Sequence, residues 1–131
     1  MSIAVTQAAV QLQQQAETIS PHQVIALLLD GALERLQQAQ SAFFDGKLQE
    51  AQELVDRAIA IVNGLRSSLD MDKGGEVARN LDALYEYIAA RLQQDNATDP
   101  AAVLSEASKL LAEVKAGWDG IAEAAPVRAV G

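Results

Sequence analysis

Apolar side chains recur three or four residues apart in four long segments, and this spacing limits the fold more than any other feature. Such spacing places the apolar side chains on one face of an α-helix. The segments span residues 21–43, 48–69, 77–92 and 100–121. Because short turns join them, neighbouring helices must run antiparallel. The sequence therefore predicts an all-α fold, an antiparallel up-down-up-down four-helix bundle with a short N-terminal arm or helix.

Turn and cap residues mark the ends of these segments. Ser20 and Gln23 have the spacing of a capping box, with Pro21 at the first helical position. Gly46 ends the first helix, because glycine adopts the left-handed conformation at little cost. At the start of the last helix, Asp99 can cap and Pro100 can occupy the first position.

Two adjacent glycines, Gly74 and Gly75, interrupt the pattern between the second and third segments. Together they would cost about 2 kcal/mol inside a helix relative to alanine. They therefore indicate either a turn or a tight helix entrance.

The ends of the chain differ from its centre. Residues 1–19 are rich in Gln and Ala, with a poor apolar stripe, and are interpreted as a mobile arm. Residues 20–123 form the predicted bundle, and residues 124–131 form a predicted disordered tail. The N-terminus lacks the basic and apolar regions of a signal peptide, and no apolar stretch is long enough to cross a membrane. We therefore expect a cytoplasmic (cytosolic) protein.

Charge and cysteine content exclude several functions. The 131 residues include 18 acidic and 10 basic residues, for a net charge of -8. This balance argues against binding to nucleic acid or to an anionic membrane surface. The absence of cysteine excludes disulfides, thiolate metal sites and a cysteine nucleophile.

His22 is the only histidine, and it lies in the first turn of a predicted helix. A di-iron bundle needs Glu-x-x-His on two helices, and a phosphotransfer bundle needs an exposed histidine in mid-helix. We therefore interpret His22 as a solvated or capping residue. No enzyme activity, cofactor or metal is expected.

The apolar stripes on several helices are wider than one packing contact needs. Ile59 flanks Ala58, and Leu27 flanks Leu28. A helix that is apolar over a wide arc is either central in the core or offers a second face to a partner. Core packing is the simpler interpretation for any single position, and binding of a guest helix in a groove is the functional one.

Five motifs stand in order between about residue 18 and residue 121: Thr18-x-Ser20-Pro21-His22-Gln23, Leu28-Leu29-Asp30-Gly31-Ala32, Leu69-Asp70-Met71-Asp72-Lys73-Gly74-Gly75-Glu76-Val77-Ala78-x-Asn80-Leu81, Leu84-Tyr85-x-Tyr87-Ile88, and Trp118. Together they resemble the FliS family of flagellar secretion chaperones for flagellin. The block from residue 69 to residue 81 is long enough to make the resemblance specific.

The resemblance implies a helical bundle that binds the disordered C-terminal segment of flagellin in the cytosol. Binding would prevent premature polymerisation and present flagellin to the flagellar type III export gate. Other flagellar regulators are further candidate partners. In related proteins the N-terminal arm can cover part of the groove when flagellin is absent.

Two positions depart from the family pattern. Family members often carry a Tyr in the N-terminal arm, where this chain has Val10-Gln11-Leu12. The residue before the Asp-Gly pair is commonly aromatic, and here it is Leu29. Both differences reduce the aromatic anchors available to the arm or to the guest.

The predicted flagellin contacts lie on one face of the second and third helices, with two leucines of the first helix beside them. Core packing competes with guest contact at each of them. Tyr85 is the strongest single candidate, because it combines a large apolar face with a hydroxyl. The full set is Leu28, Leu29, Ile61, Leu65, Leu69, Ala78, Asn80, Leu81, Leu84, Tyr85 and Ile88.

A second interpretation needs no guest. The surplus apolar faces would also suit a structural or regulatory bundle that associates with copies of itself. A tight dimer that ignores flagellin would favour this alternative.

Overall fold

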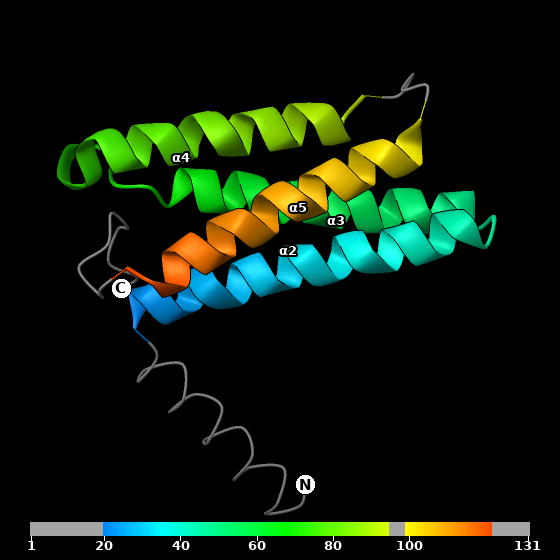
Figure 1. The fold of residues 1–131 in the computed structure, drawn as a ribbon, viewed down its shortest axis with the longest axis horizontal. Helices are drawn as coiled ribbons and strands as arrows, with labels where there is room; N and C mark the ends of the chain where they lie inside the picture. Colours follow the sequence, from blue (N-terminus) through cyan, green and yellow to red (C-terminus); the bar gives the residue numbers. More distant parts are fainter. Residues whose placement is uncertain (1–19, 95–98, 122–131) are drawn as a thin grey trace, which may run out of the picture.

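Four α-helices account for nearly all of the described chain. The computed structural model describes residues 20–94 and 99–121. In these ranges the helices are α2 (Pro21–Phe44), α3 (Leu48–Ser67), α4 (Met71–Leu92) and α5 (Pro100–Asp119). Each helix reverses the direction of the one before it (Figure 1). The predicted antiparallel up-down-up-down bundle is confirmed, whereas the predicted arm (1–19) and tail (124–131) lie outside the described residues.

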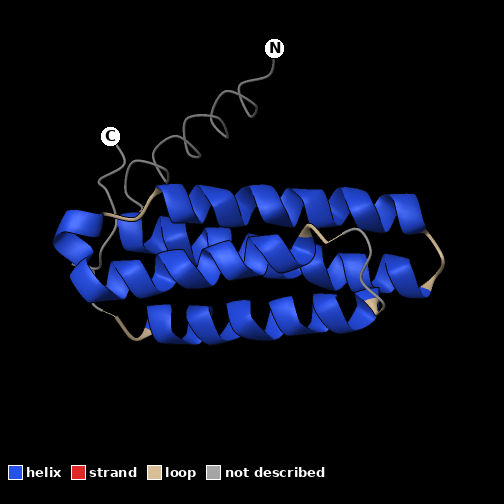
Figure 2. Ribbon diagram, turned by 90° about the horizontal axis from the view of Figure 1, so that it is seen from above, coloured by secondary structure: helices blue, strands red, loops and turns tan. Residues whose placement is uncertain are grey.

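The helices pack in a closed ring. α2 packs against α3 and α5, and α4 packs against α3 and α5. Within the described residues the backbones of the two diagonal pairs, α2 with α4 and α3 with α5, do not approach each other closely. The view from above shows the same alignment of the helices along one direction (Figure 2). Every helix therefore has one inward face and two lateral seams.

The inward faces supply an apolar core. Its largest fully buried side chains come from all four helices, and no polar or charged residue of the described ranges is buried. Alanines occupy many of the remaining inward positions on α2 and α3, which lets these helices approach closely. The largest core side chains are Trp118, Tyr85, Leu29, Leu36, Leu65, Ile88, Leu111 and Val62.

The predicted caps at the starts of α2 and α5, and the predicted glycine at the end of α2, are confirmed. Ser20 Oγ accepts a hydrogen bond from the Gln23 amide at 3.1 Å, and Gln23 Oε1 accepts one from the Ser20 amide at 3.2 Å. Gly46 has a φ of 78°, in the left-handed region. Asp99 Oδ1 accepts from the Ala102 amide at 3.1 Å, with Pro100 at the first helical position.

The glycine pair forms a tight helix entrance. α4 begins at Met71, before the glycines, and Asp70 caps it by accepting from the Asp72 and Lys73 amides. Gly75 then interrupts the helix with φ 54° and ψ -127°. Only glycine adopts this backbone conformation without strain. The helical turn before Gly75 therefore joins the rest of α4 through a kink.

His22 has a different role from the one predicted. Its ring stacks on Trp118, with ring centroids 4.7 Å apart and planes 10° from parallel. His22 Nε2 donates to the Trp118 carbonyl oxygen at 2.8 Å, and Trp118 Nε1 donates to the His22 carbonyl oxygen at 2.9 Å. The interpretation of His22 as a solvated residue was wrong, because its side chain is partly buried. It does not cap its own helix but hydrogen-bonds a carbonyl in the last turn of α5.

Candidate binding groove

An apolar groove lies between α4 and α5, towards the end of the bundle where α2 begins. Its volume is about 290 Å³. We call it the α4–α5 groove. Glu113 is the one charged residue among those that line it. The lining residues are Val77, Leu81 and Leu84 from α4, and Glu113, Val114, Gly117, Trp118 and the following Ile121 from the α5 side.

Small and fixed side chains keep this groove open. A Cβ atom added to Gly117 would meet no atom within 4 Å, so this position leaves free space between the helices. Trp118 is 2% exposed, and its stack and hydrogen bonds with His22 hold it in place. Val77 is 48% exposed and Ile121 is 37% exposed. The groove thus combines a fixed aromatic ring with accessible apolar residues.

A polar bridge joins α4 and α5 further along the seam. Tyr87 Oη donates to Glu106 Oε1 at 2.9 Å, and Arg91 Nε donates to the same oxygen at 3.0 Å. The hydrogen bond from Tyr87 is the main cause that lowers the pKa of Glu106, and it raises the pKa of Tyr87. The bridge holds the two helices together beyond the groove.

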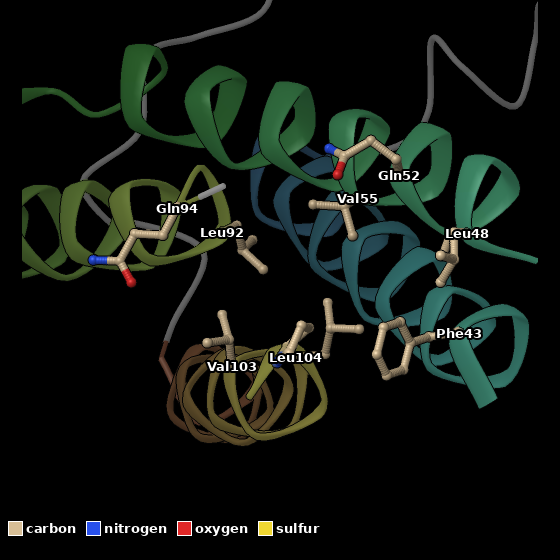
Figure 3. Close-up of a pocket in the computed structure, with 10 residues that line it drawn as sticks. Phe43, Leu48, Gln52, Val55, Leu92, Gln94, Val103 and Leu104 are labelled. Carbon is tan, nitrogen blue, oxygen red and sulfur yellow. The ribbon is translucent and has the colours of Figure 1, made fainter. Parts of the chain in front are cut away.

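A second cleft lies at the opposite end of the bundle, near the turn between α2 and α3. Its volume is about 200 Å³. Figure 3 shows Phe43, Leu48 and Val55 on one side of this space, with Leu92, Val103 and Leu104 across from them. We call it the hairpin-end cleft.

The structure places the predicted contact residues in three environments. Leu81 and Leu84 line the α4–α5 groove. Leu28 and Ile61 are half-buried on α2 and α3, and Asn80 is exposed on α4. The other six belong to the buried interior: Leu29, Leu65, Leu69, Ala78, Tyr85 and Ile88.

Tyr85 illustrates the buried group. It is 1% exposed, and burial raises the pKa of its hydroxyl to about 12. In this conformation its ring is part of the core, so direct contact with a guest would require the helices to separate. Its role in guest binding stays a prediction.

The predicted set contained no groove residue from the fourth helix. Val114, Gly117 and Ile121 line the groove, together with Val77 of α4, which was also left out. The apolar spacing of both helices signalled these positions. Spacing alone did not show that the apolar faces of α4 and α5 would lie side by side and leave a groove between them.

The described ranges contain neither a cluster suited to a metal ion nor a membrane-spanning helix. No group of three or more His, Cys, Asp or Glu side chains is placed there to hold a metal ion. None of the four helices α2 to α5 combines the length and the apolar character that membrane crossing requires.

The fold and the groove place the chain among antiparallel helical bundles with an open apolar seam. Comparison with known families identifies the family to which it belongs. The model of the family described as "Flagellar protein FliS" matches residues 4–125. The chain therefore belongs to the FliS family.

Curated relatives agree with this assignment. The chain is 47% identical over 112 residues to flagellar secretion chaperone FliSB of Pseudomonas aeruginosa, covering 86% of this chain and 89% of that protein. It is 37% identical over 115 residues to flagellar secretion chaperone FliS of Salmonella typhimurium, covering 87% and 85%. The Vibrio cholerae FliS is 34% identical over 112 residues, covering 86% and 82%. The family is one of flagellar export chaperones and not of enzymes, in agreement with the sequence.

Proposed function

We propose that this chaperone binds the C-terminal segment of flagellin in the α4–α5 groove. Binding takes place in the cytosol, keeps flagellin from polymerising early, and delivers it to the flagellar type III export apparatus. The single observation that carries the proposal is the preformed apolar groove, in a chain whose relatives are named flagellar secretion chaperones.

The groove suits a guest that becomes ordered as it binds. An amphipathic segment can bury its apolar side chains against Val77, Leu81 and Leu84 while its polar side faces water. Ordering the segment costs several kcal/mol, so the net affinity is moderate. Moderate affinity suits a chaperone that must release its guest at the export gate.

Both groups of predicted residues have a place in this proposal. Leu81 and Leu84 contact the guest directly. Ala78, Tyr85 and Ile88, on the same helix, pack into the core and hold the groove wall in position. Leu28, Ile61 and Asn80 are contacts for parts of the guest that extend beyond the groove.

Calorimetry with the cognate flagellin tests the proposal. The titration uses the full chain against monomeric flagellin and, separately, against its C-terminal segment. We expect one guest per chaperone and loss of at least about tenfold in affinity for Val77→Glu, because a buried unpaired carboxylate costs more than 1.4 kcal/mol. Val77 is 48% exposed, so the substitution leaves the core intact.

Ala83→Glu is the matched control. Ala83 is exposed on the same helix and does not line the groove, so this variant adds the same charge with no effect on binding. If wild-type chaperone shows no binding at tens of micromolar, the function is refuted. If Val77→Glu and Ala83→Glu both bind like the wild type, the guest lies elsewhere.

The variant Tyr85→Glu distinguishes two roles of Tyr85, structural support of the groove and direct contact with the guest. Because Tyr85 is 1% exposed, we expect this variant to lose helical structure in circular dichroism as well as flagellin binding. A folded Tyr85→Glu variant without binding would instead make Tyr85 a direct contact.

A further inference from the structure

One wall of the α4–α5 groove leads directly into the residues that follow it in the chain. Gly120 is the C-cap of α5, and Ile121 comes next and lines the groove. The ten residues after it, 122–131, therefore start at the groove itself. We call them the post-groove segment.

The charge and apolar character of this segment complement those of the groove. Glu113 is the one charged residue that lines the groove, and no ion pair of the described residues includes it. The segment carries two valines, Val127 and Val130, and Arg128 is its one basic residue. An arginine matches a carboxylate in charge and in geometry, and valines suit an apolar wall.

The segment is long enough to run back along the groove. Glu113 and Ile121 are eight residues apart on the α5 side, which corresponds to about 12 Å at the helical rise. Pro126 disfavours helical backbone at the residue before it, so the chain can reverse direction there. Residues 126–130 in extended form span about 13 Å. This length matches that of the groove.

We infer that the post-groove segment docks in the α4–α5 groove of its own chain. Val127 packs on Val77 and Leu81, and Arg128 pairs with Glu113. Residues 122–131 are then an internal competitor of flagellin. The competition rests on the function proposed above, whereas the docking itself does not.

Two observations favour this segment over other occupants. The link to Ile121 gives it an effective concentration in the millimolar range, so a weak contact holds it, whereas a second copy has no such advantage. Residues 1–19 contain no arginine or lysine, so they offer Glu113 no side-chain partner.

A spin label on the segment tests the docking without flagellin. The chain has no cysteine, so Gly131→Cys gives one site for a nitroxide. In the full chain we expect the label to broaden the amide NMR signals of Leu84 and Val114, which line the groove, and to leave that of Phe44 at the other end of the bundle sharp. Groove signals that stay sharp overturn the inference.

A variant with the same tether separates docking from mere proximity. Val127→Asp with Arg128→Glu keeps the length of the segment and the label but removes both anchors, so the broadening at Leu84 should fall by at least about tenfold. Equal broadening in this variant overturns the inference. So does broadening in a mixture of spin-labelled chains with separate isotope-labelled chains, because the segment of a second copy would then be the occupant.

A charge swap tests the ion pair. Glu113→Arg alone should lower the broadening by about threefold, and Glu113→Arg combined with Arg128→Glu should restore it. Glu53→Arg makes the same change of charge on α3 outside the groove and should have no effect. A swap that fails to restore the broadening overturns the pairing.

Flagellin titrations test the competition. A groove that is free in one third of the molecules weakens the apparent affinity about threefold, so Val127→Asp with Arg128→Glu should bind flagellin about threefold more tightly than the wild type. Unchanged affinity overturns the competition. Tighter binding in Leu12→Asp and not in this variant also overturns it, by making residues 1–19 the occupant. If flagellin does not bind at all while the label still broadens Leu84, the proposed function fails and the docking is supported.

Discussion

The α2–α3 seam and the α4–α5 seam are both largely apolar, and they differ in the size of their side chains and in how completely they close. On α2 and α3 many inward positions are alanines, such as Ala32 and Ala58, each fully buried. Gly31 lies next to Ile61 of the facing helix, where an added Cβ would sit 3.7 Å from Ile61 Cδ1. Small residues let this pair pack closely along its length.

The α4–α5 seam closes only in part. Valines and leucines line the groove, and Gly117 leaves open space beside them. The hydrogen bonds of Glu106 with Tyr87 and Arg91 join the helices further along. The comparison teaches that one seam of the ring packs closely along its length, while the seam across the bundle leaves an open apolar groove.

Truncation of one leucine near each seam should show the difference most strongly. Leu36→Ala on α2 should cost about 2–5 kcal/mol of unfolding free energy, because Leu36 is fully buried and its removal leaves a cavity. Leu84→Ala should cost less than half as much, since Leu84 already borders an open groove. Urea unfolding followed by circular dichroism measures both, and equal costs would mean that the two seams pack equally well.

Two glycine substitutions should change the free energy of unfolding in opposite directions. Gly75→Ala should destabilise the fold by about 1–3 kcal/mol, because alanine is strained at a φ of 54°. Gly31→Ala should stabilise it by up to about 1 kcal/mol, because it removes a helix-interior glycine and its Cβ makes an ordinary contact with Ile61. Thermal unfolding of both variants provides the check. A destabilising Gly31→Ala would show that the α2–α3 seam has no space left for a methyl group.

Local opening of the backbone should be more frequent at the α4–α5 seam than at the α2–α3 seam. Amide hydrogens of residues 78–85, beside the groove, should exchange at least about tenfold faster than those of residues 32–39 on α2, since fewer packed neighbours hold them. Hydrogen exchange measured by mass spectrometry resolves these peptides. Equal protection would remove the distinction between the seams, and added flagellin segment should slow exchange only beside the groove.

The smallest effect concerns the polar bridge and its pH dependence. The lowered pKa of Glu106 means that its carboxylate stabilises the folded state above the usual glutamate value of 4.5. This contribution is lost as the pH falls below 4.5 and through the lowered pKa. Glu106→Gln should therefore be slightly less stable than the wild type at neutral pH and equal to it in acid. A difference that persists in acid would show that charge is not the cause.

The helices and their ends were predictable because their signals are local. Ser20 and Gln23 are three residues apart, and Pro100 follows Asp99 directly, so each cap can be read without knowledge of the fold. The up-down-up-down order followed from short turns. The start of α4 was placed too late, because a glycine pair signals a break without saying on which side a helical turn forms.

The site was less predictable, because periodicity identifies a helix face without naming its neighbour. Leu84 and Tyr85 are adjacent in one wide apolar arc, yet the first borders the groove and the second is buried in the core. The pairing of His22 with Trp118 joins residues 96 apart, and no local sequence pattern near either residue predicts it. Such pairs can be identified only from the three-dimensional arrangement of the helices.

That pairing has a topological consequence. His22 and Trp118 bring the first turn of α2 and the last turn of α5 into contact, so the four-helix ring is closed in space although the chain is linear. A short linker from Ile121 to Ser20 would convert the bundle into a circular chain, and a cut at the exposed Gly46 turn would then give a permuted protein with the same seams. The architecture is thus set by which helices are neighbours, and the place where the chain starts is secondary.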